Sequence, residues 1–349
     1  MMNRGLNMKK VAIIGLGPMG IRHIQACRNS KELDLAGGAD LNVARVEELI
    51  SDGFLPSGGG FSDYKQMIVE LKPDIVVIST NAPSHYDIFH EVVNLGVKNI
   101  LCEKPIATSI EQAINMIETA SLYDVLLLVN HSRRWCLDYV ELKSLLEIGE
   151  IGKVESVTFS MGGGQMGCNG MHIFDLISYL TGARVDKLIG FLNDEGVENP
   201  RGKHFFDPGG YALVHLDCGI RVYFEMTEDL GIPPLLIING TYGRVTIEET
   251  KKRMTVEKRA SEDCELPVTR YGTPLKHVTE HFFEHLDIVE LTRVGLENLA
   301  KGEILADPSD ALKALEVVIA IHASHEMGNK MIMLPINENH TIEKVFSFT

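Results

Sequence analysis

The 349-residue sequence lacks the features that mark several classes of protein. Its 33 lysines and arginines are outnumbered by 48 aspartates and glutamates, which gives a net charge of −15 and makes nucleic acid an unfavourable partner. No apolar run approaches the roughly 20 residues that span a bilayer, so we expect no membrane partner. None of the six cysteines forms a Cys-x-x-Cys pair, which favours scattered reduced thiols in a cytoplasmic protein. Internal repeats and low-complexity segments are absent as well.

The first part of the chain alternates short apolar runs with helix-length amphipathic stretches. Continuous apolar runs are typical of parallel strands that are covered on both faces. We predict strands over residues 11–14, 33–39, 75–79, 98–102 and 125–129. We predict helices over residues 19–28, 42–50, 63–71, 84–95 and 110–122, the last one capped by Ser109 with Gln112 at the third position. This alternation predicts a doubly wound parallel sheet.

The beginning of the first strand has a second interpretation. Basic residues at positions 9 and 10 precede an apolar stretch, as in a secretory signal. Gly15 and Gly17 interrupt that stretch, and no small-residue cleavage site follows, so we predict a strand.

After about residue 133 the pattern changes. A helix is predicted over residues 137–146, and a long one over 310–327. Between them, alternating polar and apolar residues predict antiparallel strands over 154–160, 212–216, 221–226, 235–239 and 244–248. The sequence therefore predicts two domains, residues 1–130 and residues 131–349.

A glycine-rich motif follows the first predicted strand and opens the first helix. The motif is Gly15-Leu16-Gly17-Pro18-Met19-Gly20. Such glycines let the backbone approach a pyrophosphate, which then lies at the helix N-terminus. Asp40 ends the second strand, where a carboxylate binds the adenosine ribose hydroxyls and repels a 2′-phosphate. The pattern predicts an NAD site, with NADP disfavoured.

Two further segments carry groups suited to proton transfer. Glu103-Lys104-Pro105 closes the fourth predicted strand, at the sheet edge where ligands bind, and Lys104 there can bind a hydroxyl or act as general acid or base. A glycine-rich run from 162 leads to His172 and Asp175, and His172 can exchange a proton with a substrate. Taken alone, Lys104 could be a surface lysine in a loop, and a lone histidine such as His172 is more often structural than catalytic.

Taken together, these residues resemble the Gfo/Idh/MocA family of glucose–fructose oxidoreductases and inositol dehydrogenases. The resemblance extends over nearly the whole chain, and the Glu103-Lys104-Pro105 triplet is its most specific element. Other matching segments are Thr80 to His85, residues 163–175, 180–182, 240–244 and 310–335. The resemblance implies an N-terminal Rossmann domain and a C-terminal α/β domain with a large open, mostly antiparallel sheet. It also implies pairing of subunits through that sheet, as a homodimer or homotetramer.

The resemblance also implies roles for individual residues. Lys104 and His172 would form the catalytic pair, acting on a sugar, nucleotide sugar or cyclitol. Substrate contacts would come from Cys168, Asn169, Asp175 and Arg133. Cofactor contacts would come from the glycine motif, Asp40, Thr80, Asn81, His85, Glu103, Lys104, Arg134 and Trp135.

Position 168 departs from the inositol dehydrogenase pattern, which has an aspartate four residues before the histidine. Cys168 is neutral and binds a sugar hydroxyl less well than a carboxylate does. Two alternatives therefore stay open, a catalytically weak cofactor-binding regulator of the same fold and an NAD-dependent glycosidase.

His281-Phe282-Phe283-Glu284-His285 has the spacing of an inverted zinc-peptidase motif. No third ligand is evident, so we predict an ordinary helix with Phe282 and Phe283 packed inward, and no metal.

Overall fold

A computed structural model describes residues 8–193, 198–270 and 272–348. Two compact units make up the chain: unit 1 contains residues 1–135 and 287–312, and unit 2 contains residues 136–286 and 313–349. Each unit is described by itself below. The expected α/β class, with one parallel and one mostly antiparallel sheet, is confirmed.

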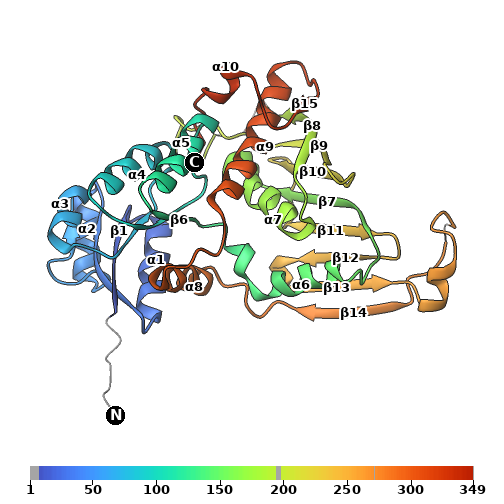
Figure 1. Cartoon of the computed structure of the whole chain (residues 1–349), viewed down its shortest axis with the longest axis horizontal. Helices are drawn as coiled ribbons and strands as arrows, with labels where there is room; N and C mark the ends of the chain where they lie inside the picture. Colours follow the sequence, from blue (N-terminus) through green and yellow to red (C-terminus); the bar gives the residue numbers. More distant parts are fainter. Residues whose placement is uncertain (1–7, 194–197, 271, 349) are drawn as a thin grey trace, which may run out of the picture. The chain divides into compact units, whose positions relative to one another are not determined.

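Unit 1 is built on a six-stranded parallel sheet in the order β3-β2-β1-β4-β5-β6 (Figure 1). Its strands are β1 (Lys9–Ile14), β2 (Leu33–Ala39), β3 (Gly60–Phe61), β4 (Ile75–Ile78), β5 (Asn99–Cys102) and β6 (Leu126–Val129). The four residues of β4 and the last four of β1 are fully buried, as expected for central strands with helices on both faces. The predicted strands are therefore confirmed, and only the two-residue β3 was not predicted.

Five helices connect these strands. They are α1 (Pro18–Asn29), α2 (Val43–Ser51), α3 (Tyr64–Leu71), α4 (His85–Asn94) and α5 (Ile110–Leu122). A 3₁₀ turn, η1 (Ala82–Ser84), precedes α4. The Ser109 hydroxyl accepts the Gln112 backbone N–H at 3.1 Å, so the predicted cap is present. The Gln112 side chain, however, accepts from the Thr108 backbone N–H rather than from that of Ser109.

Residues 287–312 depart from the expected division, which assigned them to the second domain. They contain α8 (Ile288–Lys301), which buries Leu291, Leu296 and Leu299 and packs against α1. The Ser30 hydroxyl donates to Glu297 at 2.6 Å. Burial of this apolar helix face explains why the segment returns to unit 1.

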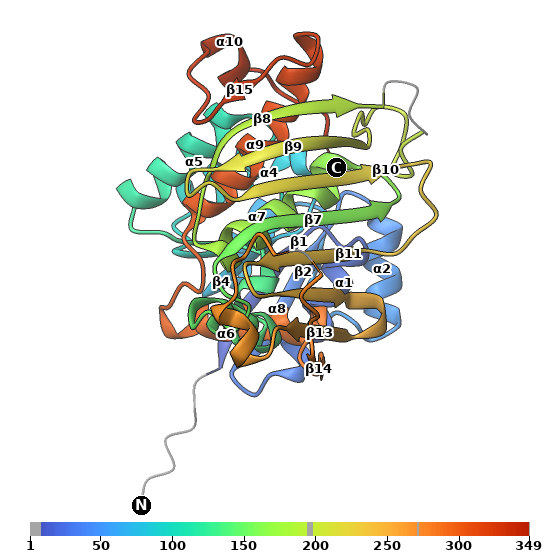
Figure 2. The ribbon, with the colours of Figure 1, turned by 90° about the vertical axis from the view of Figure 1, so that its right-hand side faces the viewer.

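Unit 2 contains a nine-stranded sheet in the order β14-β13-β12-β11-β7-β10-β9-β8-β15, which Figure 2 shows face on. The strands are β7 (Val154–Gly162), β8 (Val185–Leu192), β9 (Gly210–Leu216), β10 (Arg221–Thr227), β11 (Leu235–Gly240), β12 (Gly243–Glu248), β13 (Arg253–Lys258), β14 (His277–Phe282) and β15 (Ile332–Met333). All pairs are antiparallel except β7 with β10.

One face of this sheet is covered by helices. The helical segments are α6 (Leu137–Glu147), α7 (Met171–Thr181), α9 (Pro308–Glu326), whose residues from 313 onward belong to unit 2, and α10 (Asn339–Ile342). Phe224 stacks on Phe174 of α7, with ring centroids 4.4 Å apart, and Val222 and Met226 are buried beside it. The opposite face exposes Tyr223 of β10.

Two expectations for unit 2 were wrong or incomplete. Residues 281–285 do not form a helix, because His281 and Phe282 end β14 and pair with β13. Phe283 is buried as expected, but Phe282 is 64% exposed. Strands β8 and β13 were not predicted, although both pair along most of their length.

Two general properties concern the helices and the cysteines. Within the described ranges, no helix is both long and apolar enough to cross a membrane. All six cysteines are free thiols, and four of them are buried. Burial raises the pKa of the Cys136 thiol to about 11, which keeps this group protonated and unreactive.

Candidate active site

Polar groups of unit 1 gather where its parallel strands end. Gly15 follows β1, Asp40 follows β2, Thr80 follows β4, Glu103 follows β5 and Asn130 follows β6. The carboxyl ends of parallel strands share one edge of a sheet, and ligands bind in the crevice there. The topology therefore brings together the predicted cofactor residues of this unit.

The three motif glycines are required for different reasons. A Cβ at Gly15, where φ is +91°, would lie 2.8 Å from the backbone of Ser79, and a Cβ at Gly20 would lie 2.2 Å from the Gly15 carbonyl oxygen. These two glycines are needed by the fold itself. A Cβ at Gly17, by contrast, would meet no described atom within 4 Å, and φ there is an ordinary −69°.

Gly17 is also the N-cap of α1, and no side chain caps this helix. The first backbone N–H groups of a helix have no partner within it and attract anions. An open, uncapped helix N-terminus after a glycine turn fits the pyrophosphate of a dinucleotide, which Pro18 and Met19 would also border.

Asp40 fixes the geometry of this turn. Its Oδ2 accepts the Leu16 backbone N–H at 2.8 Å, and its Oδ1 accepts the Asn42 N–H at 2.9 Å. A carboxylate can accept about four hydrogen bonds, so these two contacts leave acceptor capacity for ribose hydroxyls. Asp40 thus joins the end of β2 to the glycine turn.

His85 connects two other loops of the same edge. Its ring nitrogens lie 2.9 Å from the Thr80 carbonyl oxygen and 2.8 Å from the Pro105 carbonyl oxygen. Burial lowers the pKa of this imidazole. Because both ring nitrogens face backbone carbonyls, His85 holds the loop after β4 against the loop after β5. Asn81, beside Thr80, is exposed.

Glu103 is buried in a polar cluster that the sequence did not reveal. His23 Nε2 lies 2.8 Å from Glu103 Oε1, and the Asn130 amide donates to the same oxygen at 2.7 Å. Burial by itself would raise the Glu103 pKa, but His23, Asn130 and Lys104 hold it at about 2. Glu103 is therefore an anion, and the cluster fixes the backbone that carries the half-buried Lys104.

The segment after β6 makes its described contacts within unit 1. Arg134 Nη1 lies 2.9 Å from Asp310 Oδ2, and the Trp135 indole N–H donates to the Leu291 carbonyl at 2.8 Å. Arg133 is half-buried. These contacts anchor the segment to 287–312, and its role beside a cofactor or substrate stays a prediction.

In unit 2, the glycine-rich run forms one turn of π-helix, η3 (Met166–Gly170), that leads directly into α7. Asp207, 40 residues away, accepts the Gly167 N–H at 2.5 Å and the Cys168 N–H at 2.9 Å. The Phe348 ring fills the space beside Gly167, where a Cβ would come within 2.5 Å. Asp207 and Phe348 therefore hold this turn in place.

The predicted residues of unit 2 lie on or beside this turn. Cys168 and Asp175 are buried, His172 is half-buried on the first turn of α7, and the Asn169 amide donates to the Gly164 carbonyl. Lys104 belongs to unit 1 and His172 to unit 2, so their pairing stays a prediction. Asp207 was not predicted, because no motif in the sequence connects it with the turn that it holds 40 residues away.

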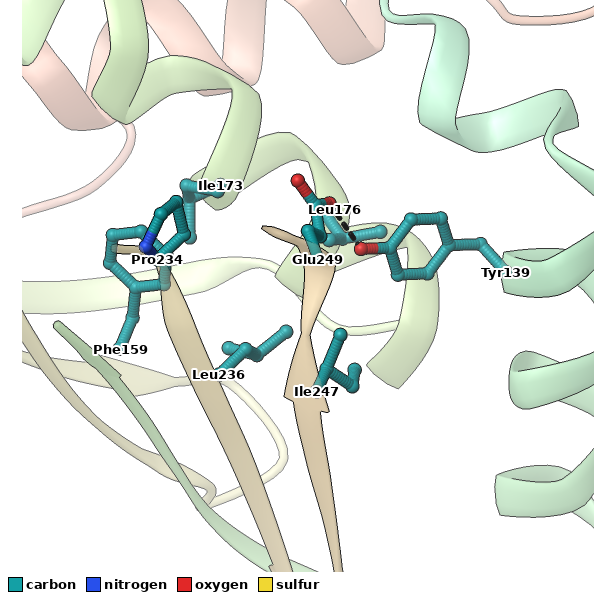
Figure 3. Close-up of a pocket in the computed structure, with 8 residues that line it drawn as sticks. All are labelled: Tyr139, Phe159, Ile173, Leu176, Pro234, Leu236, Ile247 and Glu249. Carbon is teal, nitrogen blue, oxygen red and sulfur yellow. Dashed lines mark hydrogen bonds between the residues drawn. The ribbon is translucent and has the colours of Figure 1, made fainter. Parts of the chain in front are cut away.

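A small cavity lies on the other side of α7 (Figure 3). It is lined by apolar side chains that include Ile173, Leu176 and Leu236, with Glu249 accepting a hydrogen bond from the Tyr139 hydroxyl at its edge. Its volume of about 10 Å³ and its apolar lining do not provide a polar substrate site.

The described ranges contain no group of three His, Cys, Asp or Glu side chains that could hold an ion. His281 ends a strand and His285 lies in the following loop, so the two do not share the helix face that the zinc spacing requires.

Comparison with known proteins identifies the N-terminal part. The profile of a family described as an oxidoreductase family with an NAD-binding Rossmann fold, GFO_IDH_MocA, matches residues 9–131. A trans-1,2-dihydrobenzene-1,2-diol dehydrogenase of Xenopus tropicalis is 24% identical over 288 residues, 74% of this chain and 83% of that protein. An inositol 2-dehydrogenase/D-chiro-inositol 3-dehydrogenase of Lactiplantibacillus plantarum is 26% identical over 149 residues, 42% of each chain.

A solved structure extends the likeness to the whole fold. An oxidoreductase from Agrobacterium radiobacter in complex with NAD⁺, L-tartaric acid and magnesium superimposes with a TM-score of 0.76 over 94% of this chain and 98% of that one. At 21% identity this likeness shows the shared fold alone. The profile match identifies residues 9–131 as the NAD-binding Rossmann fold of the GFO_IDH_MocA oxidoreductase family.

Proposed function

We propose that this chain is an NAD-dependent dehydrogenase that acts on a hydroxyl-bearing carbon of a sugar, nucleotide sugar or cyclitol. The observation that carries the proposal is the open space at Gly17 (a Cβ there meets no described atom within 4 Å), in a motif whose other glycines are needed by the fold. Gly17 lies at an uncapped helix N-terminus, and neither packing nor the backbone dihedral angles require a glycine there. The close approach of a bound pyrophosphate is the remaining physical reason for a glycine at this position.

The groups that would hold the cofactor are already fixed. Asp40 would bind the adenosine ribose while it holds the Leu16 amide, and its charge would repel the 2′-phosphate of NADP. The loops that His85 joins would border the nicotinamide end. Bound NAD would supply the hydride chemistry, and the protein would supply binding, orientation and proton transfer.

Lys104 is the group we assign to proton transfer. During oxidation of a carbinol carbon, its amine would take the hydroxyl proton as the hydride leaves the carbon. The buried Glu103 cluster would keep the lysine backbone in position, since Glu103 is held by both His23 and Asn130. His172 would complete the proton-transfer pair from unit 2.

The substrate class rests on the resemblance and on the printed names of relatives. Those names include dehydrogenases of a dihydrodiol and of inositols, which are small polyhydroxylated molecules. The regulator and glycosidase alternatives gain no support from these relatives. A cytoplasmic location stays a prediction from the sequence.

We also propose a homodimer or homotetramer formed through the open face of the nine-stranded sheet. Val222, Phe224 and Met226, which alternate along β10, are buried on the other face, where Phe224 stacks on Phe174 of α7. The opposite face exposes Tyr211, Leu213 and Tyr223 by 45% to 49%. Light scattering that returns the monomer mass of 38.7 kDa at micromolar concentration would refute this assembly.

The experiment for the proposed function is a cofactor titration with a matched pair of variants. The Cβ that Gly17→Ala adds has no described atom within 4 Å, so this variant should keep the wild-type melting temperature. It should nevertheless weaken NAD binding at least about tenfold, or roughly 1.4 kcal/mol. The Cβ added in the control variant Gly231→Ala also has no described atom within 4 Å, and this variant should change neither the melting temperature nor the NAD affinity.

The same titration tests cofactor choice. NAD should bind the wild-type protein more tightly than NADP, and Asp40→Ala should narrow that difference. Unchanged NAD affinity in Gly17→Ala would refute the cofactor site, and tighter NADP binding would refute the role of Asp40. A panel of sugars and cyclitols with NAD, followed by NADH absorbance, then identifies the substrate.

A further inference from the structure

A concave site lies in unit 2, away from the η3 turn. It is a cavity of about 380 Å³, open to solvent, whose lining includes Glu150, Tyr242, Lys258, Arg259, Ser261 and His277. Glu150 and Tyr242 lie near the beginning of β7, whereas η3 follows the end of that strand. Nine residues of strand at about 3.3 Å each place the two sites roughly 30 Å apart.

Arg259 is the unusual residue of this cavity. It lies just after β13, its backbone N–H donates to the Tyr242 carbonyl at 2.8 Å, and only 9% of the residue is exposed. Its Nη1 is buried and has no hydrogen-bond partner among the described residues. The guanidinium carbon lies 6.0 Å from the centre of the Tyr242 ring, which compensates only a small part of a buried charge.

The neighbouring carboxylates are engaged with other cations. Glu150 Oε1 lies 2.5 Å from Lys258 Nζ, and Asp263 Oδ2 lies 2.8 Å from Lys276 Nζ. No carboxylate within the described ranges forms an ion pair with Arg259. A buried guanidinium without an anion is costly, and it is unexpected in a chain whose net charge is −15.

We propose that this cavity binds a small-molecule oxyanion, a phosphate or carboxylate group, through the guanidinium of Arg259. The planar fork of arginine matches two oxygens of such a group, and binding satisfies the charge that the protein leaves uncompensated. The Ser261 hydroxyl and the His277 ring line the same cavity and add polar groups beside the anion. The ligand is therefore a phosphorylated or carboxylated metabolite.

Calorimetric titration with inorganic phosphate tests the proposal. Ionic strength is held constant with chloride, and saturating NAD occupies the helix N-terminus of unit 1. The variants are Arg259→Met and a matched control, Arg244→Met, which removes an arginine already paired with Glu257 on the same sheet. Wild type and Arg244→Met should show the same saturable binding, and Arg259→Met should raise the dissociation constant at least tenfold.

Other outcomes have a defined meaning. No saturable phosphate binding by the wild type, or equal binding by all three proteins, would overturn the proposal. If Arg259→Met does not fold, Arg259→Lys is the second variant, because it keeps the positive charge but lacks the planar guanidinium. It should still weaken phosphate binding at least several-fold. Equal binding by Arg259→Lys and wild type would then overturn it.

Two further arms identify the source of the anion. Titration with citrate in place of phosphate shows whether carboxylates bind more tightly, and both anions should depend on Arg259. Light scattering of Arg259→Met tests a carboxylate of a second copy as the occupant. A loss of oligomer mass in this variant alone would overturn the small-molecule site.

Discussion

Acidification should destabilise this protein in part through His322, a buried histidine in α9. His322 is 3% exposed, its Nε2 has no hydrogen-bond partner among the described residues, and the rings of Phe346 and Phe348 pack against it. Burial first, and then the charges of Lys344 and His325, lower its pKa from 6.5 to about 3. His322 is therefore neutral in the folded protein over the whole physiological range.

The size and sign of the effect follow from linkage. Between pH 6.5 and pH 3 the unfolded chain binds a proton at this position that the folded protein does not bind, so stability falls as the pH falls. Each unit below 6.5 costs about 1.4 kcal/mol, which gives a loss of about 2 kcal/mol on going from about pH 7 to about pH 5. His322→Leu replaces the titratable imidazole with an apolar side chain of similar size.

Urea unfolding followed by circular dichroism at both pH values measures the difference. The free energy of unfolding should fall by about 2 kcal/mol less in His322→Leu than in the wild type. His340→Leu, at an exposed position on α10, should keep the wild-type pH dependence. Equal pH dependence in wild type and His322→Leu would show that this histidine is not buried in neutral form.

Two further predictions concern the turn before α7. Cys168→Asp should lower kcat/KM on the true substrate, because it buries a carboxylate beside Asp207. Cys168→Ser should change kcat/KM only slightly. A large increase of kcat/KM in Cys168→Asp would contradict this prediction and favour the regulator alternative. Asp207→Asn keeps the shape but turns one acceptor oxygen into a donor group that faces a backbone N–H, so kcat should fall at least about tenfold while the NAD dissociation constant stays within about twofold. Wild-type kcat in Asp207→Asn would remove this residue from the site.

The parallel sheet could be predicted from the sequence because its signals are local. Residues 11–14 are a continuous apolar run, which is typical of a doubly covered strand, and α5 (Ile110–Leu122) has its cap and its apolar periodicity within one segment. The glycine motif and Asp40 are likewise close in sequence to the elements that they join. Each of these features depends on the order of neighbouring residues.

The features that escaped prediction depend on distant partners. Residues 281 and 282 form strand rather than helix because β14 pairs with β13, about 25 residues earlier, and nothing near His281 specifies that pairing. Helix α8 did carry a readable signal, since Asp287 caps it by accepting the Glu290 N–H at 2.9 Å. Its membership of unit 1 follows only from packing against α1.

The residues of the candidate site likewise divide into those with a local sequence signal and those that depend on distant partners. Lys104 and His172 could be selected from motifs, but Asp207 lies 40 residues from Gly167, and His23 lies 80 residues from Glu103. Such contacts are decided by tertiary packing. The uncompensated charge of Arg259 is also invisible in sequence, because its acidic neighbours are paired with other cations only in the folded chain.

The central claim is that Lys104 moves the proton while NAD takes the hydride. Lys104→Met removes the amine and roughly keeps the length of the side chain, and it leaves the hydrogen bonds of Glu103 to His23 and Asn130 in place. At saturating NAD and substrate, the rate of NADH formation should fall at least about 10²-fold, the low end of general acid–base contributions, while the NAD dissociation constant changes less than about threefold. Near wild-type turnover in Lys104→Met would contradict the account.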